Sequence, residues 1–201
     1  MAINLQKGQK VSLKKNTSTG LGEILVNLNW NAAPVKKGFL SGLFGGNAGI
    51  DLDLGCLFEL KDGSKGTVQA LGNAFGSLTA PPFAALDGDD RTGASAAGEN
   101  LRINGNKISE IQRILVYTFI YEGVANWQQA DATVTIQYPG AEDIVVKMDE
   151  FNTAHKMCGL VLLENQNDET FSVEKIVQFY PGHRELDAAF HWGLNWVAGR
   201  K

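Results

Sequence analysis

Apolar and polar residues alternate with a period of two along much of the chain, which is the pattern of β-strands that have one face against a core. The clearest run covers residues 50–61, where the even positions are apolar and the odd positions include Asp51, Asp53 and Glu59. We therefore expect a strand there with one buried face and one polar face. Residues 114–121 are apolar at nearly every position, which predicts a central strand that is buried on both faces.

The same alternation predicts two hairpins in the second half of the chain. Residues 132–138 and 143–148 are joined by Pro139-Gly140-Ala141-Glu142, which are turn-forming residues. Residues 159–164 and 172–180 are joined in the same way by the polar stretch at residues 165–168. A further alternating strand is predicted at residues 24–30, which end in Trp30.

Helical spacing of apolar residues is clear only at residues 184–192, after Pro181-Gly182. Eight to ten strands linked by turns, with one short C-terminal helix, predict an all-β fold, namely a two-sheet β-sandwich with long loops. At 201 residues the chain is long enough for one domain, and we expect a single domain over residues 1–201. Strands and helices do not alternate along the chain, which argues against a doubly wound nucleotide-binding sheet.

Composition and charge narrow the choice of partner and compartment. The chain has 18 basic and 22 acidic residues, so its net charge of −4 offers no basic excess to nucleic acid. The N-terminus lacks the pattern of a secretory signal, and no apolar run approaches the ~20 residues of a membrane-spanning helix. Cys56 and Cys158 both lie in apolar stretches, so we expect buried free thiols. The predicted location is the cytoplasm.

One acidic loop contains candidate ligands for a metal ion. Asp87, Asp89 and Asp90 lie within four positions, flanked by glycines, and Glu99 follows. Ca²⁺ takes about six to eight oxygen ligands from carboxylates, carbonyls and water, and a glycine-rich acidic loop supplies the first two kinds. The competing interpretation is a solvated turn, because Asp-Gly and Asp-Asp pairs are common turn formers and the spacing is not that of an EF-hand.

Two carboxylates on the strand at residues 50–61 can add to this loop. Asp51 and Asp53 are two positions apart, so they point to the same face with Cα atoms ~6.7 Å apart. Taken alone, however, the pair is best interpreted as the polar face of a half-exposed strand.

Signatures of catalysis are missing from the sequence. It contains no P-loop, no zinc-type spacing among its three histidines and no G-x-S-x-G motif. Residues 183–187 are polar, but after Pro-Gly they are typical of a helix start. The glycine-rich loop from Phe39 to Phe44 has two interpretations: it inserts into a partner or a lipid surface, or it folds over the sandwich as a cap.

Several segments together resemble the TerD family of bacterial proteins tied to tellurite resistance and to chemical or phage stress, especially its TerA-like branch. The most specific match is Gly88-Asp89-Asp90-Arg91-Thr92-Gly93, which is similar to the family's Gly-Asp-Asn-Arg-Thr-Gly loop. Asp51-Leu52-Asp53 is similar to the family's Asp-Leu-Asp strand. Residues 5–13, 24–30 and 115–121 match further family segments.

The resemblance implies a β-sandwich that binds Ca²⁺ through Asp51, Asp53, Asp89, Asp90 and Glu99, with Asp87 next in order. It implies a non-enzymatic stress-response module whose partners are other stress-response proteins, including members of the same family. Association with a membrane surface through the loop from Phe39 to Phe44 is a separate expectation, which comes from the apolar residues of that loop. After Gly93 the loop carries a single carboxylate, so we expect fewer or weaker ion sites than acidic members have. Two alternatives remain: a metal-dependent hydrolase of phosphate esters that uses the same carboxylates, and an ion-free interaction domain.

Overall fold

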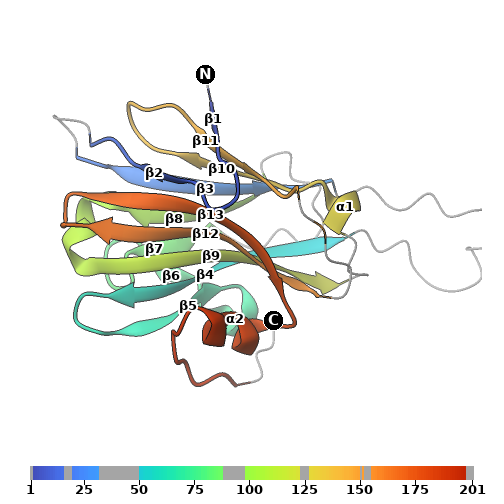
Figure 1. Ribbon diagram of the computed structural model, residues 1–201. Coiled ribbons are helices and arrows are strands. Elements are labelled where there is room, and N and C mark those ends of the chain that lie inside the picture. Colours follow the sequence, from blue (N-terminus) through green and yellow to red (C-terminus); the bar gives the residue numbers. More distant parts are fainter. Residues whose placement is uncertain are drawn as a thin grey trace, which may run out of the picture.

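The computed structural model describes residues 2–15, 20–31, 50–87, 98–122, 127–149, 151 and 155–197. Thirteen strands in these ranges form two facing sheets, so the fold is the predicted β-sandwich (Figure 1). The loop from Phe39 to Phe44 and the loop residues Asp89 and Asp90 lie outside the described ranges.

The first sheet has seven strands, which are antiparallel to their neighbours except for the parallel pair at one edge. Its strands are, in spatial order, β1 (Ile3–Asn4), β11 (Ile144–Lys147), β10 (Thr133–Gln137), β3 (Glu23–Asn29), β8 (Glu99–Asn104), β7 (Ala84–Leu86) and β6 (Gly76–Ser77). The antiparallel pairing of β10 with β11 confirms the first predicted hairpin.

The second sheet has six strands, all antiparallel to their neighbours. Its strands are, in spatial order, β2 (Lys10–Ser12), β13 (Thr170–Tyr180), β12 (Met157–Gln166), β9 (Ile111–Glu122), β4 (Asp51–Leu60) and β5 (Lys65–Gln69). The pairing of β12 with β13 confirms the second predicted hairpin. As expected, β9 is a central strand with neighbours on both sides.

The two sheets bury a shared core between them. Alternate residues of β3, such as Ile24 and Val26, pack there with the even-numbered residues of β4, such as Leu52 and Leu54, and all four are fully buried. Cys56 and Cys158 are buried free cysteines, as predicted. Burial raises the pKa of the Cys56 thiol to about 12, which keeps it protonated and unreactive.

The expectation of a polar outer face on β4 is wrong. Its odd-numbered residues from Asp51 to Leu57 are buried as well as its even-numbered ones. Helix α2 (His183–Ala189) and the chain that follows it lie against this sheet, and Leu186 and Trp192 pack in one cluster with Leu57 (Figure 1). A segment some 130 residues later in the sequence therefore covers the face that the local pattern predicts to be solvated.

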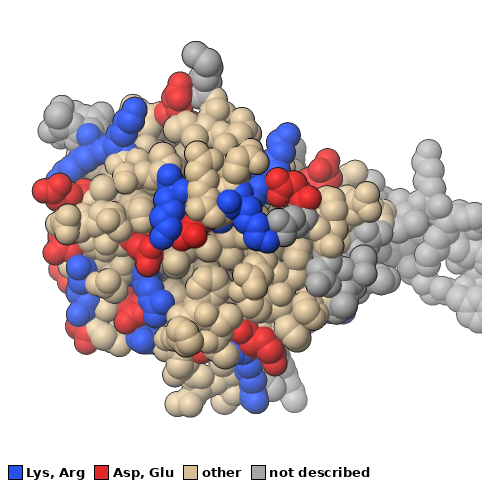
Figure 2. Space-filling model, viewed as in Figure 1, with Lys and Arg blue, Asp and Glu red and all other residues tan. Residues whose placement is uncertain are grey.

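The remaining elements are short. Helix α2 confirms the predicted C-terminal helix, while the single turn α1 (Trp127–Ala130) and the 3₁₀ helices Leu71–Asn73 and Gly105–Glu110 were not predicted. Strands β6, β7 and β8 were not predicted either. Among the described residues, no helix has the length and apolar character needed to cross a membrane. Lys and Arg side chains are interspersed with Asp and Glu over the face drawn in Figure 2.

Candidate acidic site

Three of the predicted ligands are buried residues at the starts of β4 and β8. Asp51 and Asp53 are the first and third residues of β4, and Glu99 is the first residue of β8 in the facing sheet. Their exposed fractions are 8% for Asp51, 0% for Asp53 and 3% for Glu99. Carboxylates are seldom buried to this degree unless they are paired or bind a metal, so this end of the sandwich is a candidate binding site.

Glu99 connects the two sheets through its side chain. Its Oε2 accepts a hydrogen bond from the Leu54 backbone N–H at 2.6 Å. The ladder between β4 and β5 ends at the pair Gly55 and Gln69, so Leu54 lies just beyond the last residue that β5 could bond. The Glu99 carboxylate therefore accepts the backbone hydrogen bond of Leu54 that a longer β5 would otherwise accept. Because the acceptor is charged, this hydrogen bond is strong.

Asp53 and Glu99 reach the start of β4 from different sides. Glu99 shares its parity with Leu101 and Ile103, whose side chains lie in the core between the sheets. Asp53 shares its parity with Leu57, which belongs to the cluster on the outer face of the six-stranded sheet. The two carboxylates thus flank the backbone of β4 at Leu54, one from within the sandwich and one from outside it.

Asp87 has a different environment. Both of its carboxylate oxygens accept hydrogen bonds from Arg102, Oδ1 from Nε at 2.5 Å and Oδ2 from a terminal nitrogen at 2.7 Å. Arg102 also donates to Glu23 at 2.5 Å. The hydrogen bond from Arg102 holds the pKa of the Asp87 carboxyl below its usual value. The Asp87 side chain is therefore part of an exposed ion-pair network on the outer face of the seven-stranded sheet.

The described residues do not by themselves complete a metal site. Within the described ranges, no three His, Cys, Asp or Glu side chains are grouped so that they could hold one ion. Their chemistry nonetheless suits a hard cation, because Asp51, Asp53 and Glu99 offer only oxygen donors. A full set of ligands would need further oxygens, and Asp89 and Asp90 of the sequence motif lie outside the described ranges.

A buried polar cluster beside this site was missed at the level of sequence. The Tyr117 hydroxyl donates to Gln69 Oε1 at 2.7 Å and is hydrogen-bonded to Thr67 Oγ1, also at 2.7 Å. Desolvation raises the pKa of Tyr117, and the nearby negative charge of Asp53 adds to the effect. The available signal was a tyrosine within an otherwise apolar run, because a buried phenol needs a hydrogen-bond partner.

The sequence matches known proteins over most of its length. The TerD domain model matches residues 1–138. The chain is 44% identical over 199 residues to the tellurium resistance protein TerA of Alcaligenes sp., which covers 99% of this chain and 58% of that protein. It is 38% identical over 105 residues to the tellurium resistance protein TerZ of Serratia marcescens, which covers 52% of this chain and 51% of that protein. It is 32% identical over 131 residues to the stress response protein SCP2 of Bacillus subtilis strain 168, which covers 64% of this chain and 65% of that protein. The chain thus spans between half and two thirds of the length of these relatives.

Solved structures share the fold at low sequence identity. A homologue of the telluride resistance protein TerD from Streptomyces coelicolor A3(2) superposes with a TM-score of 0.56 at 15% identity, over 88% of this chain and all of that one. A protein of unknown function superposes with a TM-score of 0.61 at 12% identity, over 87% of this chain and 99% of that one. The sandwich architecture is therefore common to these proteins.

Proposed function

The chain belongs to the TerD family, and from this premise we propose that it is a non-enzymatic, calcium-binding module of a tellurite or chemical stress response. The names of its relatives, which refer to tellurium resistance and stress response, support the biological setting. The proposed location is the cytoplasm.

The observation that carries the calcium proposal is the burial of Asp51, Asp53 and Glu99 around the first residues of β4. Removing a carboxylate from water is unfavourable by several kcal/mol unless another charge compensates it. A divalent cation would add to the interactions that these three side chains already make within the protein. Donors that are all oxygen, on a chain with glycine-rich loops, favour Ca²⁺ over softer metals.

We propose that Asp51, Asp53, Asp89, Asp90 and Glu99 supply ligands to bound Ca²⁺, Glu99 from within the sandwich and Asp53 from its outer face, and that Asp87 does not. Both oxygens of Asp87 are already hydrogen-bonded to Arg102, a permanent cation, so an ion there would have to displace the guanidinium. In this proposal the ion orders the loop between Asp87 and Glu99 against β4. The ordered loop then presents a surface to other stress-response proteins, and the loop from Phe39 to Phe44 provides a second contact, with a partner or a membrane surface.

Calorimetric titration of metal-stripped protein with Ca²⁺ and with Mg²⁺ tests this proposal. We expect Ca²⁺ to bind more tightly, because Mg²⁺ demands a compact octahedron with ligands at ~2.0–2.1 Å. Asp53→Asn should weaken Ca²⁺ binding at least tenfold. Asp62→Asn is the matched control, because Asp62 lies in the turn after the same strand and accepts a hydrogen bond from Ser64 N at 2.8 Å.

Thermal unfolding provides an independent measurement. Ca²⁺ at ~100 times its dissociation constant should add ~2.7 kcal/mol to the free energy of unfolding. For a protein of this size that corresponds to a rise of roughly 5–11 °C in the melting temperature. If millimolar Ca²⁺ produces neither heat nor a shift, the calcium proposal is wrong and the ion-free interaction domain replaces it. Turnover of a phosphate ester that depends on Asp53 would instead favour the hydrolase.

A further inference from the structure

One side of the sandwich ends in two edge strands, β2 of the six-stranded sheet and β1 of the seven-stranded sheet (Figure 1). The backbone of Gln9 and Leu13 bonds to β13, and Leu13 N donates to the Phe171 carbonyl at 2.9 Å. Bonded residues alternate along an antiparallel pair, so the backbone N–H and C=O of Lys10 and Ser12 point away from β13. Both residues are exposed, and among the described residues nothing bonds to these outward-facing backbone groups.

A cavity of about 330 Å³ lies beside this edge, between the two sheets. Its lining includes Val11, Ser12 and Lys14 at β2, Ile3 of β1, and Tyr138 with the turn that follows it. Val11 and Ile3 are half-buried and give the cavity an apolar wall that continues into the core. The Tyr138 hydroxyl accepts a hydrogen bond from Lys14 N at 3.1 Å, which ends the unpaired stretch of the edge. The edge therefore combines free backbone groups with a pocket for a side chain.

The charges along this edge favour an acidic partner. Lys14 and Lys15 are exposed and form no ion pair with another described residue, whereas Lys10 is paired with two glutamates of the same sheet. Glu142, which also lines the cavity, already interacts within the protein. A second copy of this chain fits poorly, because antiparallel pairing of two β2 strands brings Lys10 and Lys14 of one copy next to those of the other. Complementary charge instead comes from aspartate or glutamate.

We propose that this edge binds an extended, acidic segment of a partner protein, which adds to β2 as a further strand. The segment's backbone bonds to the outward-facing groups of Lys10 and Ser12, and its alternate side chains give specificity. The side chain opposite Val11 points inward and fills the cavity, so it is apolar. The side chains before and after it lie on the outer face beside Lys10 and Lys14, so they are acidic. The recognised sequence is thus an alternation of acidic and apolar residues, and its binding does not depend on calcium.

Lysines on an edge strand have another known role, because they keep a sheet from pairing with other chains. That role accounts for the charge of β2 but not for the cavity beside it. The two roles predict opposite results when an acidic strand-forming peptide is offered to the protein.

Hydrogen exchange with a synthetic peptide of alternating glutamate and valine tests the proposal, with a chelator present so that calcium plays no part. At saturating peptide the amides of Lys10 and Ser12 should exchange at least tenfold more slowly than in the free protein. The amide of Leu13, which is already bonded to Phe171, is the internal control and should change much less. A scrambled peptide of the same composition should have no effect at these positions.

Two variants locate the peptide on this edge. Ser12→Pro removes an outward-facing N–H but none from the ladder with β13, and proline is tolerated at such edge positions, so affinity should fall at least tenfold. Lys14→Glu reverses a charge beside the cavity and should lower affinity several-fold, which keeps the test decisive if the proline variant does not fold. Lys147→Glu, at the exposed end of β11, makes the same change in net charge and is the control.

Two results would overturn the proposal. If the alternating peptide does not slow exchange at Lys10 and Ser12, or if neither variant weakens its binding, the lysines only protect the edge. If sedimentation shows a dimer of this chain that Ser12→Pro disrupts, the occupant of the edge is a second copy and not an acidic segment.

Discussion

The outer face of the six-stranded sheet is covered over β4 and β9 by the C-terminal part of the chain (the covered face), whereas the described residues leave the outer face of the seven-stranded sheet half-buried or exposed (the open face). On the covered side, both faces of β4 are buried along most of its length, and Tyr117 and Leu115 of β9 have no exposed surface. On the open side, β3, β8 and β10 alternate between buried and half-buried or exposed residues, as a sheet with one wet face does.

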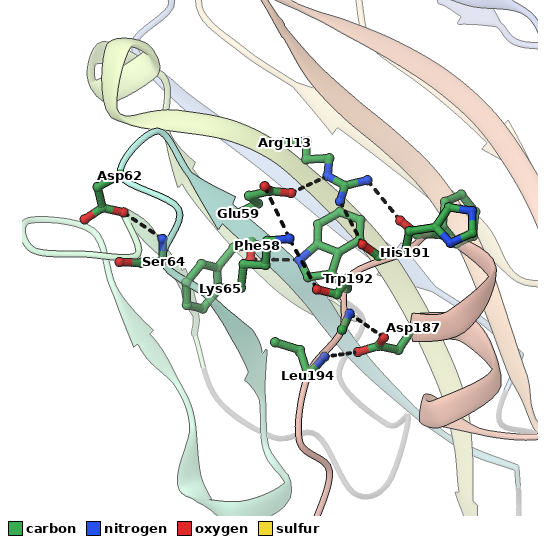
Figure 3. A network of polar contacts seen from close by, with 12 residues as sticks. Phe58, Glu59, Asp62, Ser64, Lys65, Arg113, Asp187, His191, Trp192 and Leu194 are labelled. Atoms are coloured by element: carbon green, nitrogen blue, oxygen red, sulfur yellow. Dashed lines mark hydrogen bonds and ion pairs between the residues drawn. The ribbon is translucent and has the colours of Figure 1, made fainter.

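Each face carries an arginine at the centre of an ion-pair network, and the difference between the two is instructive. On the open face, Arg102 contacts Asp87 and Glu23, and all three side chains are about a third or more exposed. On the covered face, Arg113 contacts Glu59 but also stacks on Trp192 and donates to the Phe190 carbonyl at 3.0 Å. The arginine–carboxylate pair therefore helps to hold a chain segment in place on the covered face (Figure 3), whereas on the open face it only links surface side chains.

The largest effect is expected where the covered face is held. Trp192→Ala removes a 2% exposed indole, its hydrogen bond to Phe58 and the stack on Arg113, and it should lower the free energy of unfolding by about 3–5 kcal/mol. Urea denaturation measures this change. Trp192→Phe, which keeps a ring, should recover a large part of the loss. A loss below about 1 kcal/mol for Trp192→Ala would mean that residues 190–197 contribute little to the stability of the fold.

The second effect is a loss of stability between pH 6.5 and pH 4 that comes from His183 on the covered face. Burial lowers the pKa of His183 to about 4, whereas an unperturbed histidine titrates near 6.5. Between these values the unfolded chain binds more protons than the folded one, so stability falls as the pH is lowered from 6.5 towards 4. At ~1.4 kcal/mol per pKa unit, the full change is about 3 kcal/mol.

Denaturation curves recorded between pH 7 and pH 4.5 test this sign. His183→Phe should flatten the dependence, because the variant keeps an aromatic ring between Phe119 and Trp196 but has no proton to bind. His191→Asn is the matched control, because His191 is exposed and its backbone φ of 55° suits asparagine. If the free energy of unfolding of His183→Phe depends on pH as steeply as that of the wild type, His183 is not the group responsible.

A smaller effect on the same face comes from its close packing. A Cβ atom at Gly55 would lie 2.7 Å from the Tyr117 ring, so Gly55→Ala must displace that ring and its hydrogen bond to Gln69. We expect a loss of about 1–3 kcal/mol, measured by urea denaturation. Thr135→Ala, at a half-buried position of β10 on the open face, should change stability by less than about 0.5 kcal/mol. Equal losses in the two variants would erase the contrast between the faces.

The sequence predicts the strands well because their periodicity is a local property. The alternation at residues 132–138 and 143–148 becomes the hairpin of β10 and β11, and the apolar run at residues 114–121 becomes the centre of β9. The second layer over β4 could not be predicted in this way. The alternation of β4 is the same whether water or the distant helix α2 covers its odd-numbered residues. The sequence pattern therefore indicated that Asp53 was exposed, although it is buried.

The site shows the same limit of local reasoning. The motif places Asp87 with Asp89 and Asp90, and proximity in sequence suggests one group of ligands. The pleat of the seven-stranded sheet instead directs Asp87 outward, where it meets Arg102 across the ladder between β7 and β8. Glu99 joins Asp53 at Leu54 only because two strands from different sheets begin at the same end of the sandwich.

The smallest effect is therefore expected for Asp87→Asn, on the open face. Exposed ion pairs contribute about 0–1 kcal/mol, so the free energy of unfolding should change by less than ~1 kcal/mol. Arg102→Gln should give a similar small loss, and the double variant should show coupling of the same order. The Ca²⁺ affinity of Asp87→Asn should stay within about threefold of wild type, because this change breaks only a surface ion pair. The affinity of Asp53→Asn should fall tenfold or more, because this change removes a negatively charged ligand of the ion. A tenfold loss for Asp87→Asn would instead show that Asp87 leaves Arg102 to bind the ion, and the open face would then take part in the site.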